Sequence, residues 1–515
     1  MMTGYFSRLI PSISLALLLG GCGTTIDRDY PRTASSAISD PQSTTVGALF
    51  QEAADHHPNQ SGFAFVREGS RAFIDRLAMA DLAEKTLDAQ YYIWNGDTTG
   101  LIMAERILRA ADRGIRVRLL LDDMYQTEER DRNVAALDAH PNIEIRLFNP
   151  LENRSWRLWS FLGDFSRVNR RMHNKLFIMD NAVAIAGGRN IADIYFGVSS
   201  DHNFRDVDMA MAGPIVKALS ASFDEFWNSA SAIPAGALVR DRMTDQDLAG
   251  FRKRLDERIA AAGYPYPIDE KIADLGQDMV KIRNGFIWAP GQVIADDPVR
   301  ASNDDGTEVI KDALIQRAGE SKHEVLVESP YFIQVDAGIE FLRRLTSRGV
   351  KVRVLTNSAA TNDVMAAHAG YASTRKKLLE AGVELYELRP DSDMKREWSI
   401  AAGRSRAALH SKLLVFDRQT VFIGSPNLDP RSRALNTEIG VVIDSSEIAA
   451  QMAAFVEEGM APGSAYKLTL DSDGDLVWTA DTEGQKTTFD SDPNVGLWSR
   501  LMIAIIGILP IEDYL

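Results

Sequence analysis

The chain of 515 residues contains two copies of one sequence pattern, and this repeat limits its fold more than any other feature. Each copy opens with an apolar run, and a helical segment follows that is predicted to end at an Arg-Gly pair, which holds Gly114 in the first copy and Gly349 in the second. Two further apolar runs follow. The copy then closes on the pattern H-x-K-x-x-x-x-D, which begins 59 residues after Gly114 and 61 residues after Gly349. Apolar runs of strand length that alternate with helical segments indicate βαβ units.

The repeat predicts an α/β fold of two similar halves, each a mixed, largely parallel sheet flanked by helices. We expect the halves at residues 61–230 and 305–460, packed with pseudo-two-fold symmetry around one active site. Residues 231–304 are predicted to form a connector that wraps the surface, and residues 461–515 a C-terminal extension. A chain of this length exceeds what one compact core usually holds, which agrees with a division into two domains.

The two closing motifs have identical spacing. A lysine follows each histidine by two residues, an aspartate by seven, and an asparagine in a glycine-containing turn by seventeen. A lone His-x-Lys on a strand is usually a chance surface feature, but two copies with equal offsets and similar preceding segments indicate a real site. The candidate residues are His173, Lys175, Asp180 and Asn190 in the first half, and His410, Lys412, Asp417 and Asn427 in the second.

These residue types indicate chemistry on a phosphodiester. Alternate side chains of a strand share a face, so the histidine and lysine of each motif point the same way. Lysine ammonium groups and asparagine amides bind phosphate oxygens. One histidine can attack phosphorus and form a phosphohistidine, and the other can carry the proton of the leaving or entering alcohol. These steps require no cofactor and no metal ion, and the residues alone do not decide which histidine attacks.

Each histidine also needs a hydrogen-bond acceptor for its other ring nitrogen. Asp208 and Glu438 are the candidates, because the pattern aligns Asp206-x-Asp208 of the first half with Asn436-x-Glu438 of the second. Asp180 and Asp417 complete the motifs, and we expect them to fix the turn after the strand rather than to touch substrate.

Both ends of the chain carry apolar segments that are too short to span a bilayer. Near the N-terminus, an apolar run leads into Gly20-Gly21-Cys22 and resembles a bacterial lipobox. Residues 1–21 are therefore predicted to be a lipoprotein signal peptide, Cys22 the lipidated residue, and residues 22–60 a flexible tether. Such an anchor places the protein in the bacterial cell envelope, facing the periplasm, on the outer rather than the inner membrane. Residues 497–515 either pack on the body, which we favour, or lie at the bilayer surface.

Composition argues against some classes of protein. The net charge of −15 and the lack of an evident basic stripe argue against nucleic acid as a partner. The single cysteine excludes a disulfide within the chain and a cysteine-based metal site. A catalytically inactive membrane scaffold is disfavoured because both motifs keep their histidine and lysine.

The motifs resemble the phospholipase D superfamily, which is characterised by HxKxxxxD followed by a G-[GS]-x-N turn, and the resemblance spans residues 62–459. Finer features are similar to its bacterial cardiolipin synthase branch. These features lie at residues 170–175 (RRMHNK), 187–197 (GGRNIADIYFG), 355–372 (LTNSAATNDVMAAHAGYA), 382–390 (GVELYELRP) and 425–440 (SPNLDPRSRALNTEIG).

This resemblance implies a phosphatidyltransferase that moves a phosphatidyl group from one phospholipid to phosphatidylglycerol at a membrane surface. His173 is then the nucleophile and His410 the acid and base. The donor is phosphatidylglycerol or phosphatidylethanolamine. Asp363, His368 and Tyr371 are candidates for the acceptor pocket, although an ordinary helix with polar residues is the interpretation that we favour for them. The alternatives are a phospholipase D that hydrolyses phospholipids to phosphatidic acid and, less favoured, a nuclease of the same superfamily.

Overall fold

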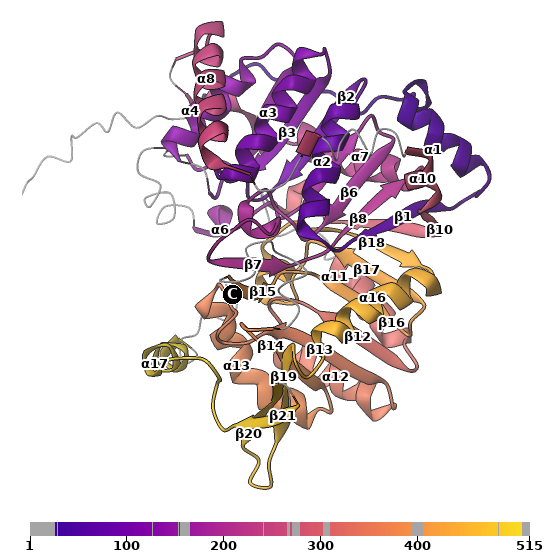
Figure 1. Ribbon diagram of the computed structural model, residues 1–515, viewed down its shortest axis with the longest axis vertical. Helices are drawn as coiled ribbons and strands as arrows, with labels where there is room; N and C mark the ends of the chain where they lie inside the picture. The colour runs from indigo at the N-terminus through magenta and orange to yellow at the C-terminus, as the bar shows by residue number, and fades with distance from the viewer. Residues whose placement is uncertain are drawn as a thin grey trace, which may run out of the picture.

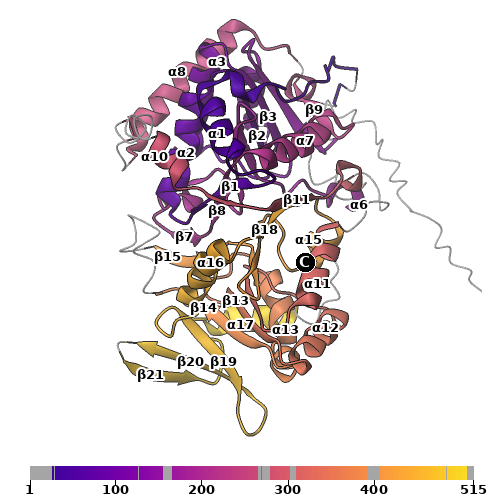
Figure 2. The same cartoon turned by 90° about the vertical axis from the view of Figure 1, so that its right-hand side faces the viewer.

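The computed structural model describes residues 26–27, 29–125, 127–152, 154, 165–239, 241–264, 268–269, 279–301, 309–392, 405–482 and 484–506. The chain forms two α/β halves that lie one above the other in Figure 1 and again in the turned view of Figure 2. Each half has one large mixed sheet, and a short parallel pair, β7 (His202–Arg205) with β15 (Arg406–Leu409), joins them. The predicted pair of α/β halves is confirmed.

The first half is built around one sheet with helices on both faces (Figure 1). Its strand order is β10 (Ile287–Ala289), β1 (Ser61–Val66), β8 (Asp208–Ala212), β6 (Val183–Gly187), β5 (Leu176–Met179), β2 (Thr86–Tyr91), β3 (Arg116–Asp122), β4 (Ile143–Phe148) and β9 (Ala232–Pro234). Its helices are α1 (Thr45–Asp55), α2 (Gly69–Leu82), α3 (Thr98–Asp112), α4 (Glu128–Asp138), α6 (Phe165–Val168), α7 (Pro214–Asn228), α8 (Asp245–Ala262) and α10 (Met279–Asn284).

The second half repeats this arrangement, because β18-β17-β16-β12-β13-β14 follows the same order as β8-β6-β5-β2-β3-β4. Its full strand order is β11 (Gly291–Ala295), β18 (Ile439–Asp444), β17 (Thr420–Gly424), β16 (Leu413–Phe416), β12 (Glu324–Glu328), β13 (Lys351–Asn357), β14 (Glu384–Leu388), β19 (Ala465–Leu470), β20 (Leu476–Thr482) and β21 (Gln485–Phe489). Its helices are α11 (Val309–Glu320), α12 (Asp336–Ser347), α13 (Met365–Glu380), α15 (Pro430–Ala434), α16 (Ser446–Gly459) and α17 (Leu497–Ile506). Short 3₁₀ turns lie at Pro41–Ser43, Asp193–Tyr195, Ala235–Leu238 and Pro298–Ala301.

The sheets are less parallel than the sequence predicts. Among the described residues of the two large sheets, β2-β3-β4 and β12-β13-β14 pair in parallel, and the other pairings are antiparallel. A helix joins each neighbouring pair of these parallel strands, because a parallel connection needs such a crossover. The helices α3 and α12 stop where the Arg-Gly pairs predict, since Gly114 and Gly349 have φ of 92° and 86°.

A continuous apolar core connects the two halves. One cluster of buried side chains includes Leu176 and Phe223 of the first half together with Leu413 and Phe455 of the second. Inward-facing residues of both sheets and of α7 and α16 belong to this cluster. The two halves therefore fix each other's position through packing as well as through β7 and β15.

The predicted tether is wrong from residue 29 onward, because this segment packs on the first half. Arg118 Nη1 donates to the Ser35 carbonyl at 3.0 Å, and Trp227 Nε1 donates to Ser35 Oγ at 3.0 Å. Phe50 of α1 is buried in the core. Partners nearly 200 residues away in sequence hold the segment in place, and local composition does not reveal them.

The connector at residues 231–304 does more than wrap the surface. It contributes β9 and β10 to the edges of the first sheet and β11 to the edge of the second. Similarly, the C-terminal extension continues the second sheet through β19, β20 and β21. Both segments are thus integral parts of the halves.

Candidate active site

The two histidine motifs lie where the halves meet, and backbone hydrogen bonds tie each motif to the opposite half. The His173 amide donates to the Thr437 carbonyl at 2.9 Å. The His410 amide donates to the Arg205 carbonyl at 2.8 Å. The two contacts are equivalent, so the repeat in sequence becomes a reciprocal arrangement in space.

The carboxylate beside each histidine also comes from the opposite half. His173 Nδ1 lies 2.9 Å from Glu438 Oε2, and His410 Nδ1 lies 2.8 Å from Asp206 Oδ2. Both carboxylates are buried, and the two histidines are only 7% and 8% exposed. A proton on Nδ1 that is donated to the carboxylate fixes the tautomer, so that Nε2 carries the lone pair that reacts.

Asp206 therefore takes the position for which the sequence favoured Asp208. The strand register explains the error, because Gly187 pairs with Asp208 on β8 while Gly424 pairs with Gly440 on β18. Counting back two residues from each partner aligns Asp206 with Glu438. Asp208 instead forms buried ion pairs with Arg76 at 2.9 Å and with Arg189 at 3.2 Å.

Each motif lysine is buried beside its own histidine. Lys175 Nζ donates to the His173 carbonyl, and Lys412 Nζ lies 3.2 Å from His410 Nε2. Burial lowers the pKa of Lys175 to about 7 and the pKa of Lys412 to about 8, because desolvation disfavours the charged form. An anionic phosphodiester in the site favours the protonated lysines and so strengthens its own binding.

Burial also lowers the pKa of both histidines to about 4. Nearby lysines act in the same direction, whereas Glu438 and Asp206 oppose the shift. Lys412 of the second motif is among the charges that lower the pKa of His173 in the first, so the two motifs belong to one electrostatic site. At neutral pH the free imidazoles are uncharged, which is the form that a nucleophile requires.

The motif aspartates lie at the far end of their strands, away from the histidines. Asp180 accepts hydrogen bonds from the backbone amides of residues 84–86, and Asp417 from those of residues 322–324. Both have positive φ, 53° and 49°, at the turn after the strand. They fix this turn and contact no other motif residue among those described, so their place in the motif is structural rather than catalytic.

The two asparagines differ in their surroundings. Asn190 is fully engaged, since its Oδ1 accepts from the Ile93 amide at 3.0 Å and its Nδ2 donates to the Tyr195 hydroxyl at 2.9 Å. Asn427 Oδ1 is buried and has no hydrogen-bond partner among the described residues. Asn427 is therefore the one that is poised to bind a polar group of a ligand.

Sequence reasoning missed the aromatic walls of the site. The Tyr92 ring packs edge-on against His173, with centroids 5.0 Å apart. Tyr195 and Phe204 pack against His410 at 5.0 and 4.8 Å. These rings exclude water and contribute to the burial that keeps the imidazoles neutral. The only signal in the sequence was the position of Tyr92 directly after an apolar strand.

Other predicted residues do not gather at the histidines. His368 lies in a buried group with Arg375, at 3.0 Å, and Tyr371 packs under the same guanidinium group. Asp363 faces the site more closely, because it accepts from the Tyr331 hydroxyl at 2.6 Å and its charge acts on His410. Cys22 lies outside the described residues.

Comparison with known proteins gives a consistent result. A family model described as "Cardiolipin synthase, PLD-like domain" matches residues 76–227 and 314–459. The chain is 37% identical over 465 residues to cardiolipin synthase C of Escherichia coli (strain K12), a match that covers 88% of this chain and 96% of that protein. It is 25% identical to cardiolipin synthase 2 of Staphylococcus epidermidis over 74% of this chain and 64% of that one.

A solved structure supports the fold. Phosphatidylserine synthase from Haemophilus influenzae Rd KW20 matches with a TM-score of 0.53 and 13% identity, over 81% of this chain and 91% of that one. At this level of identity the match shows a common fold and nothing further.

The crosswise pairing generates the first prediction. Asp206→Asn removes the carboxylate that orients His410, so we expect kcat for cleavage of a soluble phosphodiester to fall by about 10²–10⁴-fold. The midpoint of thermal unfolding is expected to stay close to that of the unmodified chain. Steady-state kinetics and differential scanning calorimetry measure the two effects.

Asp208→Asn is the matched control, two residues away. It leaves Arg76 and Arg189 without their buried counter-charge and is expected to cost about 3 kcal/mol of stability, with kcat per folded molecule kept within a few-fold. The opposite outcome, in which Asp208→Asn abolishes turnover and Asp206→Asn does not, contradicts the assignment.

Proposed function

The chain belongs to the phospholipase D superfamily, in the family of cardiolipin synthase-like domains, and on that premise we propose that it is a phosphatidyltransferase of cardiolipin synthase type. The observation that carries the proposal is the crosswise site, in which two neutral histidines and two lysines share one buried space with Glu438 and Asp206. Such a site binds a phosphodiester and divides its transfer into two steps.

In the first step, His173 Nε2 attacks the phosphorus of a phospholipid. The nitrogen–phosphorus bond forms, the bond from phosphorus to the headgroup oxygen breaks, and His410 gives a proton to that oxygen. The charge of the bound phosphodiester stabilises protonated His410, so substrate binding supplies the acid that the free site lacks. Glu438 and Asp206 hold the two rings in place throughout.

In the second step, an alcohol replaces the departed headgroup. Its hydroxyl gives a proton to His410 while its oxygen attacks phosphorus, and the bond to His173 breaks. We propose that the alcohol is the glycerol headgroup of phosphatidylglycerol and that the donor is phosphatidylglycerol or phosphatidylethanolamine. Water in place of the alcohol yields phosphatidic acid, and the aromatic walls beside both histidines favour transfer over this hydrolysis.

The second prediction tests this function with purified protein in phosphatidylglycerol vesicles, with and without phosphatidylethanolamine. Mass spectrometry is expected to detect cardiolipin, and His173→Ala is expected to lower its formation at least about 10³-fold. An exposed substitution on the first half, Val280→Ala, serves as a control that leaves the rate unchanged. Phosphatidic acid as the sole product makes the protein a hydrolase, and the absence of any lipid turnover contradicts the proposal.

The shifted pKa values give a third prediction. His173 must be neutral to attack, so kcat/KM falls as pH decreases through about 4, and not near 6.5. The lysines must be charged to hold phosphate, so kcat/KM also falls as pH rises through about 7 to 8. The first step also needs a proton on His410, whose pKa is about 4 in the free site, so kcat/KM peaks near pH 4, declines above it, and falls more steeply above about 7 to 8.

The control for this profile is Lys175→Arg, because arginine keeps its charge at high pH. We expect a lower maximum and an alkaline limb displaced toward higher pH when kcat/KM is measured on a dispersed short-chain phospholipid. An alkaline limb that does not move shows that Lys175 is not the group that titrates there.

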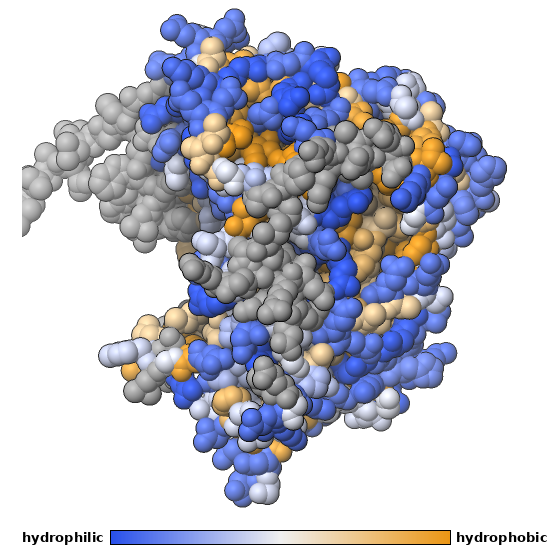
Figure 3. All heavy atoms as spheres, in the orientation of Figure 1, coloured by the Kyte–Doolittle hydropathy of each residue, from blue (hydrophilic) through white to orange (hydrophobic). Residues whose placement is uncertain are grey.

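We propose that the protein is a lipid-anchored envelope protein whose body also touches the bilayer. No helix in the described part of the chain is long and apolar enough to cross a membrane. The helix α17 packs against α13 but leaves Trp498 at 78% exposure, with Leu501, Met502 and Ile505 also exposed. On the face seen in Figure 3, other apolar side chains gather in patches on the first half, with hydrophilic ones between them. An exposed Trp/Leu/Met/Ile set on one helix suits the membrane interface.

The fourth prediction concerns α17 and uses Cys22→Ser protein, so that no lipid anchor contributes. The double variant Leu501→Glu and Trp498→Ala is expected to bind phosphatidylglycerol vesicles about tenfold more weakly in a sedimentation assay. The reason is that two apolar side chains no longer insert into the bilayer surface. Val280→Glu, which changes an exposed apolar residue of the first half, is the matched control. Equal vesicle binding by both variants contradicts a role for α17.

A further inference from the structure

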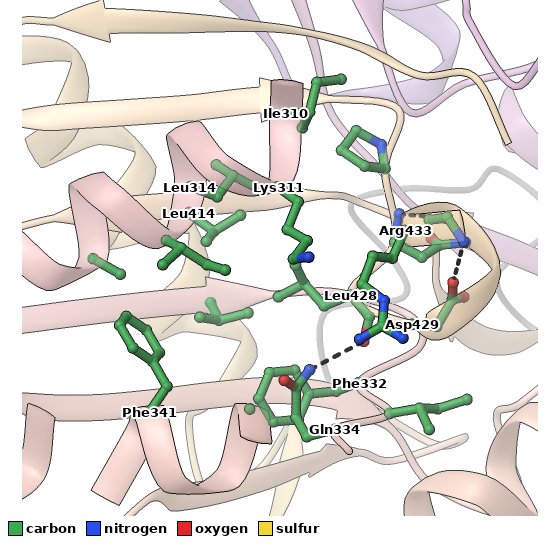
Figure 4. Close-up of a pocket in the computed structure, with 18 of the residues that line it drawn as sticks. Ile310, Lys311, Leu314, Phe332, Gln334, Phe341, Leu414, Leu428, Asp429 and Arg433 are labelled. Carbon is green, nitrogen blue, oxygen red and sulfur yellow. Dashed lines mark hydrogen bonds between the residues drawn. The ribbon is translucent and has the colours of Figure 1, made fainter. Parts of the chain in front are cut away.

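The second half contains a cavity of about 400 Å³ under α11 and α12. This volume lies within the range of about 300–1,000 Å³ that is typical of small-molecule sites. Leu414 of β16 lines it on the sheet side, and Leu314 of α11 and Phe341 of α12 line it on the helix side (Figure 4). Its walls are mainly aliphatic and aromatic. Lys311, Gln334 and Arg433 also line it, so the cavity suits a ligand that is largely, but not wholly, apolar.

The cavity lies beside the second histidine motif. His410 and Lys412 directly precede β16, and Leu414 of β16 is two residues beyond Lys412. Leu414 lines the cavity, which therefore begins one alternate position beyond the lysine. Glu438, the carboxylate that holds His173, also lines it. The cavity thus reaches the carboxylate that orients His173.

The two ends of the cavity differ in polarity. At the catalytic end are Asn427, whose buried Oδ1 lacks a partner among the described residues, and the ion pair of Asp296 with Arg300 at 3.0 Å. The remainder is lined mostly by apolar side chains such as Val325, Phe332 and Leu345, with Lys311, Gln334 and Arg344 among them. A ligand that suits this cavity has a polar group at the histidines and a long hydrocarbon part directed away from them.

We infer that this cavity holds an acyl chain of the phospholipid whose phosphate lies between His173 and His410. The inference rests on the proposed phosphatidyl transfer and adds where the lipid's apolar part is bound. An apolar cavity left empty lowers the stability of a protein, and an acyl chain offsets this cost by burying its own surface there. The lipid is thereby held at two places, because the lysines bind its phosphate and the cavity binds its acyl chain.

Leu314→Trp tests the inference, because the larger side chain fills the cavity from α11 without touching a motif residue. We expect kcat/KM for dioleoyl phosphatidylglycerol in mixed micelles to fall at least tenfold. For dihexanoyl phosphatidylglycerol, whose chains are too short to depend on the cavity, it stays within about twofold. The exposed neighbour Gln316→Trp is the matched control and leaves both substrates unaffected. Equal losses on both substrates, or no loss on either, overturn the inference.

Photolabelling makes the test independent of how well Leu314→Trp folds. Phosphatidylglycerol with a diazirine at the end of an acyl chain is expected to label peptides from α11 and α12 in the unmodified protein, and labelling confined to other segments overturns the inference. Ala318→Leu, a smaller change in the same wall, is expected to reduce this labelling.

If the unmodified protein turns over no phospholipid, the proposed function fails, while photolabelling still decides whether the cavity binds an acyl chain. If the Leu314→Trp variant turns over long-chain and short-chain phosphatidylglycerol equally well, the proposed function stands and only the role of the cavity fails.

Discussion

The active site depends on the exchange of carboxylates between the halves. Glu438 of the second half holds His173 of the first, and Asp206 of the first holds His410 of the second. Neither half on its own places an acceptor beside its own histidine. Three features bring each histidine to within hydrogen-bond distance of its carboxylate. They are the shared core, the β7–β15 pair and the reciprocal backbone contacts of Thr437 and Arg205. A repeat in sequence thus produces one site instead of two.

Burial determines what this site can do. Desolvation keeps the free imidazoles neutral and brings the lysine pKa values to about 7 and about 8, so the empty site carries less positive charge than its residues suggest. An anion restores that charge when it enters. The site is therefore selective for a ligand that brings a negative charge into an apolar space, which is the character of a phospholipid. The adjacent cavity extends this match from the phosphate to the hydrocarbon.

Much of the fold and the site could be read from the sequence, because the information was local or repeated. The equal motif spacings predicted His173, Lys175, His410 and Lys412 as one site, and the apolar runs predicted two α/β halves. The helix stops at Gly114 and Gly349 followed from backbone geometry.

What could not be read depends on contacts between distant segments. The choice between Asp206 and Asp208 rests on the pairing of β6 with β8, and a shift of two residues keeps the same face and so leaves the sequence pattern unchanged. Residues 29–60 look flexible until Arg118 and Trp227 supply partners from elsewhere in the chain. The antiparallel pairings of β5 and β16 likewise depend on neighbours that the pattern does not specify.

The most direct test of the account is to locate the covalent intermediate. Unmodified protein is mixed with phosphatidylglycerol, quenched in alkali so that phosphohistidine survives, digested and mapped by tandem mass spectrometry. The account predicts a phosphatidyl adduct, or its deacylated glycerophosphoryl form, on the peptide that contains His173, with Glu438→Gln lowering its yield because that ring loses its buried carboxylate. An adduct on the His410 peptide, or turnover without any histidine adduct, contradicts it.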